Sequence, residues 1–184
     1  MQRTTSDKFF FKPSDDISEY GMAISTEGGI YQPGGPIDVK EIPLEFLEKN
    51  IGIISVSFGQ GTTLESTNTI IQMAKLLNTT ERHRDQITAY LAVEKDSGKN
   101  AGFSMIEMDT EGKYAILGGA AVLPTYRGRG IYRKMISKRR DDARKYGIEY
   151  LIIRAMKNTS APVCEKVGFR KVCENNFYPY RVEQ

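Results

Sequence analysis

Residues 122–131 of this 184-residue chain read VLPTYRGRGI, and the interpretation of the surrounding sequence depends on them. An apolar run precedes them and a helically spaced run follows, so they join a strand to a helix through a basic loop. Amides at a helix N-terminus attract anions, and Gly128 and Gly130 let a phosphate approach the backbone with no Cβ in the way. Arg127 and Arg129 add charge and hydrogen-bond donors. The stretch predicts a phosphate-binding loop, although ordinary turns use the same glycine pattern.

The segments around this loop predict a mixed α/β arrangement. In order, the spacing indicates strands over 87–95, 101–108 and 114–123, a helix over 130–146, a strand over 148–156, a short helix over 158–166, and closing strands over 169–172 and 177–180. The longer helix connects two strands as in a right-handed βαβ unit. Gly118 and Gly119 lie inside the third strand, where glycine marks a bulge or a close approach.

The first 86 residues are harder to interpret, and their arrangement does not follow from the spacing. Short strands are expected over 9–12, 22–25 and 53–58, a helical turn over 44–48, and a helix over 63–77. Nothing in the composition marks a flexible linker, and the length suits one domain over residues 1–184.

The composition excludes several classes of site. The two cysteines, Cys164 and Cys173, are too few for a disulfide framework. The single histidine, His83, lies in a charged run, which is typical of solvated surface and leaves no histidine for a zinc site or a hydrolase triad. No apolar run has the length of a membrane span, so the expected setting is the cytoplasm without a membrane partner.

The helix over 130–146 has one apolar and one basic side. The apolar stripe consists of Ile131, Tyr132, Met135, Ile136, Ala143 and Tyr146. The basic residues are Arg133, Lys134, Lys138, Arg139, Arg140, Arg144 and Lys145. Such a face is more often solvated than bound to nucleic acid, and the net charge of the whole chain is only +3. No nucleic-acid partner is therefore expected.

At the loop, the sequence resembles the GCN5-related N-acetyltransferase (GNAT) superfamily. The signature of that superfamily is Gln or Arg, two residues, Gly, any residue, then Gly or Ala, and it falls on Thr125-Tyr126-Arg127-Gly128-Arg129-Gly130. Both glycines match and Thr125 departs. A shifted register would use Arg127 and Gly130 but would place Tyr132 where a small residue is usual, so the first register is preferred.

A second resemblance lies one helix and one strand further along the chain. Residues 158–169, NTSAPVCEKVGF, are similar to the superfamily's later segment of Asn, then Ala, then Tyr-X-Lys-X-Gly-Phe. The matching residues are Asn158, Ala161, Lys166, Gly168 and Phe169. Cys164 stands where many members have a tyrosine that donates a proton to the departing thiolate. The resemblance covers roughly residues 87–180.

The resemblance implies a mixed, mostly antiparallel sheet with flanking helices, in which the strands ending at Val122 and starting at Ile148 splay apart. A slot between them would admit the pantetheine arm of acetyl-CoA as an extra strand. The cosubstrate would pair with the backbone of Ala121, Val122 and Leu123. The expected diphosphate contacts come from Arg127, Gly128, Arg129, Gly130, Ile131 and Tyr132, and Asn158 would hold a polar atom of the arm.

The resemblance also implies direct attack by an amine, without a metal or an acyl-enzyme. A base is expected because an alkylamine has a pKa of about 10.4. Glu107 is the nearest acidic candidate, with a solvent-facing carboxylate as the alternative. Cys164 is either the proton donor or a buried packing residue, and Tyr178 or Tyr180 could replace it as donor.

The function expected from the resemblance is acetyl-CoA-dependent N-acetyltransfer to a primary amine of a small molecule or peptide. The acceptor side is expected in residues 1–86 and the acetyl-CoA-binding core in 87–180. A homodimer is compatible with this reading. The alternatives are a CoA- or acyl-CoA-binding module with little or no catalysis and, least favoured, a nucleic-acid-binding domain.

Overall fold

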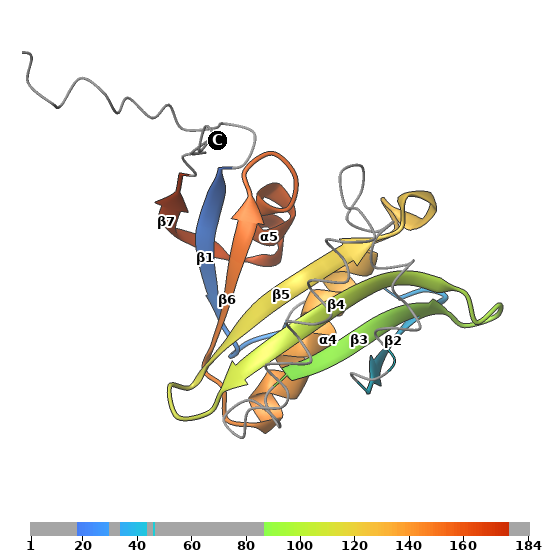
Figure 1. Cartoon of the computed structure of the whole chain (residues 1–184), viewed down its shortest axis with the longest axis horizontal. Coiled ribbons are helices and arrows are strands. Elements are labelled where there is room, and N and C mark those ends of the chain that lie inside the picture. Colours follow the sequence, from blue (N-terminus) through green and yellow to red (C-terminus); the bar gives the residue numbers. More distant parts are fainter. Residues whose placement is uncertain (1–17, 30–33, 44–45, 47–86, 177–184) are drawn as a thin grey trace, which may run out of the picture. The chain divides into compact units, whose positions relative to one another are not determined.

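The computed structural model of the chain describes residues 18–29, 34–43, 46 and 87–176 (Figure 1). Two compact units divide the chain. The larger unit is Ile24–Ile153, and the smaller unit combines Met1–Ala23 with Arg154–Gln184. Strands β1 (Glu19–Ser25) and β6 (Tyr150–Met156) each contribute residues to both.

The larger unit is built on a mixed sheet. Its strands are β2 (Ile37–Ile42), β3 (Ile87–Glu94), β4 (Asn100–Asp109), β5 (Tyr114–Val122) and the first residues of β6. Strands β2 to β5 pair in sequence order and are antiparallel, whereas β5 and β6 are parallel. The predicted mixed, mostly antiparallel sheet is confirmed. Strand β2 was not predicted from the sequence. Only Ile37 and Val39 in it are buried, so its apolar pattern is weak.

Helix α4 (Ile131–Lys145) covers one face of this sheet and packs against β4 and β5 (Figure 1). Its apolar stripe forms the core as expected, with Met135, Ile136 and Ala143 fully buried. On the other face of the sheet, Ala89, Leu91 and Phe103 form a second buried cluster. Because successive side chains of β3 and β4 point to opposite faces, these two strands contribute buried residues to both sides of the sheet.

Strand β5 contains the bulge that its glycines predict. Phe103 pairs with Ala121 and Met105 with Gly118, so the single residue Ser104 of β4 faces two residues of β5. One of these two is Gly119, whose φ of 48° is in the left-handed region. Because a side chain is disfavoured at such a φ, glycine permits the bulge here.

The smaller unit pairs β1 with β7 (Arg170–Asn175) in antiparallel fashion and carries helix α5 (Ala161–Val167). Gly168 ends α5 with a φ of 108°, as predicted from its position after the helical run. The predicted strand over 169–172 lies largely within β7, and the strand over 22–25 within β1.

Two features of α4 differ from the prediction. Tyr146 follows the helix and is 60% exposed, so it does not belong to the apolar stripe. Arg139 and Arg140 are buried, so the helix does not present all its basic residues to solvent. In the part of the chain that the structure describes, no helix is long and apolar enough to cross a membrane.

Several predicted features lie outside the described residues. They are the strands over 9–12, 53–58 and 177–180, the helix over 63–77, His83, Tyr178, Tyr180, and the helical turn over 44–48 apart from Phe46.

Candidate functional site

The loop between β5 and α4 has the compact form that its sequence predicts. A short 3-10 helix, η3 (Pro124–Tyr126), follows β5, and the amide of Arg127 donates to Pro124 O over 3.2 Å. Gly128 and Gly130 then adopt left-handed conformations with φ of 76° and 75°. Residues 127–130 are exposed. The chain thus reaches α4 through left-handed backbone, which glycine adopts more readily than any other residue.

The start of α4 is suited to an anion. Gly130 is the N-cap and provides no side-chain cap, and the first helical hydrogen bond runs from Lys134 N to Gly130 O over 3.0 Å. The amides before Lys134 therefore point out of the helix end. The first turn contains no acidic residue. Ile131 is only 2% exposed, so its contribution to a ligand would come from its backbone.

The Cβ side of Gly128 is open. Among the residues that the structure describes, a Cβ built on Gly128 would meet no atom within 4 Å, and the same holds for Gly118 beside the β5 bulge. An anionic group can therefore approach the Gly128 backbone from this side with no described atom in the way. The residues present fit the diphosphate of a CoA-type ligand at this position.

The two arginines of the loop have different surroundings. Arg127 Nε donates to Val122 O over 3.1 Å, which ties the loop to the end of β5. The Arg129 guanidinium lies 5.2 Å from the centre of the Tyr126 ring. The Tyr126 hydroxyl in turn lies 3.5 Å from a carboxylate oxygen of Glu94. The contacts with Val122 and with the Tyr126 ring thus hold the guanidinium groups of Arg127 and Arg129 beside the loop.

The edge of β5 that faces β6 is only partly paired. Pairing between the two strands consists of three residue pairs and ends at Ile116 with Ile152, whereas β5 continues to Val122. Within the larger unit, no described strand pairs with this edge of β5 beyond Ile116, so the edge could accept another extended chain.

Among the three residues expected to pair with the arm, the register distinguishes Val122. Leu123 N donates to Ala101 O over 2.9 Å, so those two residues form a hydrogen-bonded pair of the antiparallel ladder. The next pair, Gly102 with Val122, is then the non-hydrogen-bonded kind, and Val122 directs its N–H and C=O away from β4. Ala121 and Leu123 instead direct theirs toward β4. The expected backbone contacts from Ala121 and Leu123 therefore compete with sheet pairing.

Glu107 lies on β4, three pairs away from the bulge, and it is partly buried. It pairs with Ile87 on one side and with Ile116 on the other. Alternation places it on the same face as Phe103 and Met105, opposite α4. Ile116 itself is 39% exposed, so this part of the sheet face combines a carboxylate with accessible apolar surface.

The other two predicted site residues belong to the smaller unit. Asn158 is exposed in the turn after β6. Cys164 is fully buried in α5, where its carbonyl accepts hydrogen bonds from the amides of Gly168 and Phe169. A side chain with no exposed surface favours the packing interpretation of Cys164.

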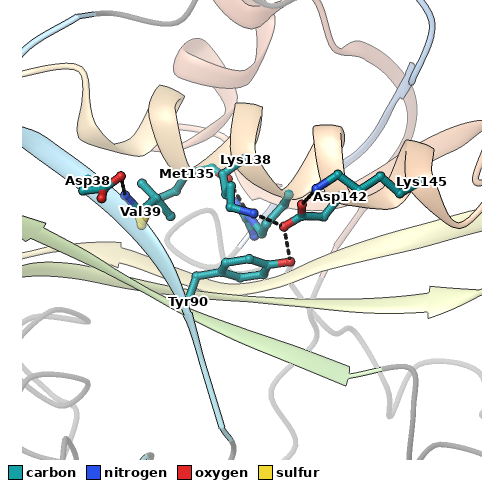
Figure 2. Close-up of polar contacts among 8 residues, drawn as sticks. Asp38, Val39, Tyr90, Met135, Lys138, Asp142 and Lys145 are labelled. Carbon is teal, nitrogen blue, oxygen red and sulfur yellow. Dashed lines mark hydrogen bonds and ion pairs between the residues drawn. The ribbon is translucent and has the colours of Figure 1, made fainter.

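A buried polar cluster joins α4 to the sheet and was not predicted. Tyr90 of β3 donates to Asp142 of α4, and Lys138 and Lys145 bind the same carboxylate (Figure 2). Burial alone would raise the pKa of Asp142, but the hydrogen bonds from Lys138, Lys145 and Tyr90 lower it below its ordinary value of 3.8. Burial and Asp142 raise the pKa of Tyr90.

Most of the basic residues on α4 have structural roles. Arg139 donates to Met105 O over 2.9 Å, and Arg140 Nε donates to Thr26 O over 3.0 Å. The Lys134 ammonium donates to Ile37 O, while Lys138 and Lys145 bind Asp142. The predicted basic surface is therefore much reduced, which weakens the nucleic-acid interpretation further. The described residues contain no group of three metal-ligating side chains.

Comparison with known proteins identifies the family. A model of the acetyltransferase (GNAT) family matches residues 61–169, more than half of the chain. The chain belongs to the GNAT acetyltransferase family. The resemblance found in the sequence is confirmed, because both motifs, 125–130 and 158–169, lie within the matched range. Membership in the GNAT family supports acyl transfer as the class of reaction.

Solved structures of GNAT proteins share this fold. A GCN5-related N-acetyltransferase from Sphaerobacter thermophilus is 18% identical, with a TM-score of 0.67 over 92% of this chain and 54% of its own. The ribosomal-protein-S18-alanine N-acetyltransferase from Escherichia coli is 19% identical, with a TM-score of 0.56 over 74% of this chain and 79% of its own. A Trypanosoma brucei acetyltransferase is 18% identical, with a TM-score of 0.53 over 80% of this chain and 99% of its own.

At these identities the likeness establishes the fold. The chain spans about half the length of the Sphaerobacter protein. No curated protein matches the sequence.

Proposed function

We propose that this GNAT chain is an acetyl-CoA-dependent N-acetyltransferase that acetylates a primary amine of a small molecule or peptide. The observation that carries the proposal is the exposed loop from Arg127 to Gly130. Its two left-handed glycines lead directly into the N-terminus of α4, and the space above Gly128 is open. Family membership supports acyl transfer, and this loop supports a CoA ester as the donor.

The chain would hold the diphosphate mainly through backbone amides. The residues proposed for this role are Arg127, Gly128, Arg129, Gly130, Ile131 and Tyr132. A helix N-terminus without an acidic residue in its first turn favours negative charge, and the two guanidinium groups add to that field. Asn158, exposed in its turn, is proposed to bind a polar atom of the arm.

The β5 edge would orient the pantetheine arm. The Val122 N–H is best placed for this, since it points away from β4, whereas the Val122 carbonyl accepts a hydrogen bond from Arg127. Bound acetyl-CoA supplies an acetyl group activated as a thioester. An amide of the β5 edge near the bulge is proposed to donate to the thioester carbonyl, where negative charge develops.

Proton transfer is the task of side chains. The acceptor amine has to lose a proton, since its pKa near 10.4 keeps it charged at neutral pH. Glu107 is the proposed base, acting through water. Because the Cys164 thiol is fully buried, it is poorly placed to act as a nucleophile, which supports direct transfer in a ternary complex.

A non-catalytic CoA-binding module of the same fold is the second candidate. It is favoured by Cys164, which is buried at the position where the resemblance implies a tyrosine donor. The Escherichia coli neighbour is named for acting on an alanine of a ribosomal protein, so a peptide amine deserves a place in the acceptor panel beside small amines.

The proposal is tested by calorimetric titration with CoA and by intact-mass measurement. CoA and desulfo-CoA are expected to bind one to one and to stabilise the fold by about 2.7 kcal/mol at a hundredfold excess over the dissociation constant. After incubation with acetyl-CoA and no acceptor, the mass of the protein should be unchanged. Stoichiometric acetylation of Cys164 would contradict direct transfer, and absence of CoA binding would contradict both candidates.

A further inference from the structure

The hydrogen bond from Arg127 to Val122 joins the two halves of the candidate site. Nε of Arg127 lies 3.1 Å from the carbonyl oxygen of Val122, five residues earlier in the chain. Val122 is the last residue of β5, and Arg127 is the last residue before the left-handed glycine at 128. The contact therefore spans the whole η3 turn and connects the strand end to the loop.

The acceptor of this hydrogen bond is well fixed. The register with β4 directs the Val122 carbonyl away from the ladder, while its neighbours Ala121 and Leu123 anchor the strand to β4. The Val122 oxygen thus belongs to rigid sheet backbone but points outward from it. An oxygen held in this way is a good reference point for a flexible loop.

The loop itself has few constraints. Gly128 and Gly130 have access to more backbone conformations than other residues, so ordering them costs more conformational entropy. Within the described part of the chain, a Cβ at Gly128 would contact no atom within 4 Å, so no described side chain packs against the Cβ side of this residue. The Arg127 amide is already bonded to Pro124 O, and the side-chain bond to Val122 adds a second fixed point on the same residue.

We infer that Arg127 is a positioning residue, which orders the amides of residues 128–131 by tying the loop to the Val122 carbonyl. The contribution of Arg127 to the affinity for an anionic ligand then depends on its Nε donor as well as on its charge. The ligand part of this inference rests on the proposed function, whereas the ordering of the loop can be measured without any ligand.

Two substitutions of Arg127 distinguish the effect of its hydrogen bond to Val122 from the effect of its charge. In Arg127→Gln the Nε2 amide stands the same number of bonds from the backbone as Nε of arginine, so it can still donate to Val122 O. In Arg127→Met the terminal methyl group occupies that place and cannot donate. Both variants lose the positive charge equally, so a difference between them reports the hydrogen bond.

The first measurement is amide hydrogen exchange of Tyr126 and Arg127 in the ligand-free protein, because these two amides are hydrogen-bonded within the η3 turn that the contact between Arg127 and Val122 spans. One net hydrogen bond corresponds to an equilibrium factor of about 2 to 12, so exchange should be roughly fivefold faster in Arg127→Met than in Arg127→Gln. Equal exchange in the two variants, with equal melting temperatures, would overturn the inference.

The second measurement is calorimetric titration of both variants with CoA. Arg127→Gln should bind CoA roughly fivefold more tightly than Arg127→Met, and equal affinities would overturn the role in ligand binding. The matched control is Arg129, which lies over the Tyr126 ring and has no such bond to Val122. Arg129→Gln and Arg129→Met should therefore differ by less than about twofold. If the parent protein does not bind CoA, the proposed function is contradicted. The ratio of amide exchange rates between the two Arg127 variants would still test whether the hydrogen bond to Val122 orders the loop.

Discussion

The Tyr90 hydroxyl donates to the Asp142 carboxylate over 3.0 Å, which connects strand β3 of the larger sheet to the last turn of α4 (Figure 2). Tyr90 is 1% exposed and Asp142 is 6% exposed. The phenol, Lys138 and Lys145 all stabilise the ionised carboxylate. This cluster holds the helix whose N-terminus forms the candidate site.

Asp142 is expected to make stability depend on pH. Its folded-state pKa is lower than its ordinary value of 3.8, so its contribution is present above that pH and is lost as pH falls through the folded value. Asp142→Asn should lower the free energy of unfolding by about 2 kcal/mol at pH 7 and by less at pH 3, because the contribution of the carboxylate begins to fall below pH 3.8. Urea denaturation at both pH values measures this. A difference that does not change between pH 7 and pH 3 would show that ionisation of Asp142 is unimportant.

Arg140 is expected to be structural, although it stands among surface-type charges in the sequence. Its guanidinium donates to the carbonyls of Thr26 and Glu27, so Arg140→Ala would leave two acceptors without their donor. We expect a loss of about 3 kcal/mol of stability, against less than about 0.5 kcal/mol for the exposed control Arg144→Ala. Chemical denaturation of the two variants should separate them clearly. Similar values would mean that the Arg140 contacts contribute little.

Cys164 is expected to fill space. Cys164→Ala should keep turnover within a few-fold of the parent and cost about 1 kcal/mol of stability, since a buried sulfur is removed. Cys164→Tyr should overpack the fully buried position and cost about 1 to 3 kcal/mol. Steady-state kinetics and thermal unfolding test both variants. A hundredfold loss of turnover in Cys164→Ala, with folding and CoA affinity intact, would instead make Cys164 the proton donor.

Two substitutions of Gly128 distinguish the effect of backbone strain on stability from the obstruction of a ligand. At a φ of 76°, valine should cost about 1 to 2 kcal/mol of stability, whereas asparagine tolerates the left-handed region. Both side chains would enter the open space above the loop, so both variants should lose most of the stabilisation by CoA. If Gly128→Asn folds like the parent and binds CoA equally well, the loop is not the phosphate site.

The glycine-containing loop between β5 and α4 and the order of elements from residue 87 to residue 176 could be predicted because they rest on local signals. Gly118 and Gly119 mark the bulge, and Gly168 ends α5, through conformations that other residues disfavour. Strand β2 escaped prediction because its short alternating sequence, IDVKEI, contains only two buried apolar residues.

The polar core could not be predicted because its contacts join distant parts of the chain. Arg140 reaches Thr26, and Tyr90 reaches Asp142, across 114 and 52 residues respectively. The sequence places Arg139 and Arg140 on the basic, solvated side of the helix because of their charge. Only the position of the backbone carbonyls and of Tyr90 shows why these groups are buried.

Acceptor-dependent release of CoA thiol tests the central claim most directly. The parent protein is incubated with acetyl-CoA and, separately, with each member of a panel of small primary amines and peptides with free N-termini. The account predicts thiol release above the acceptor-free rate with at least one amine, and the appearance of the corresponding N-acetyl product. Tight CoA binding without release for any acceptor would contradict catalysis and favour the binding module.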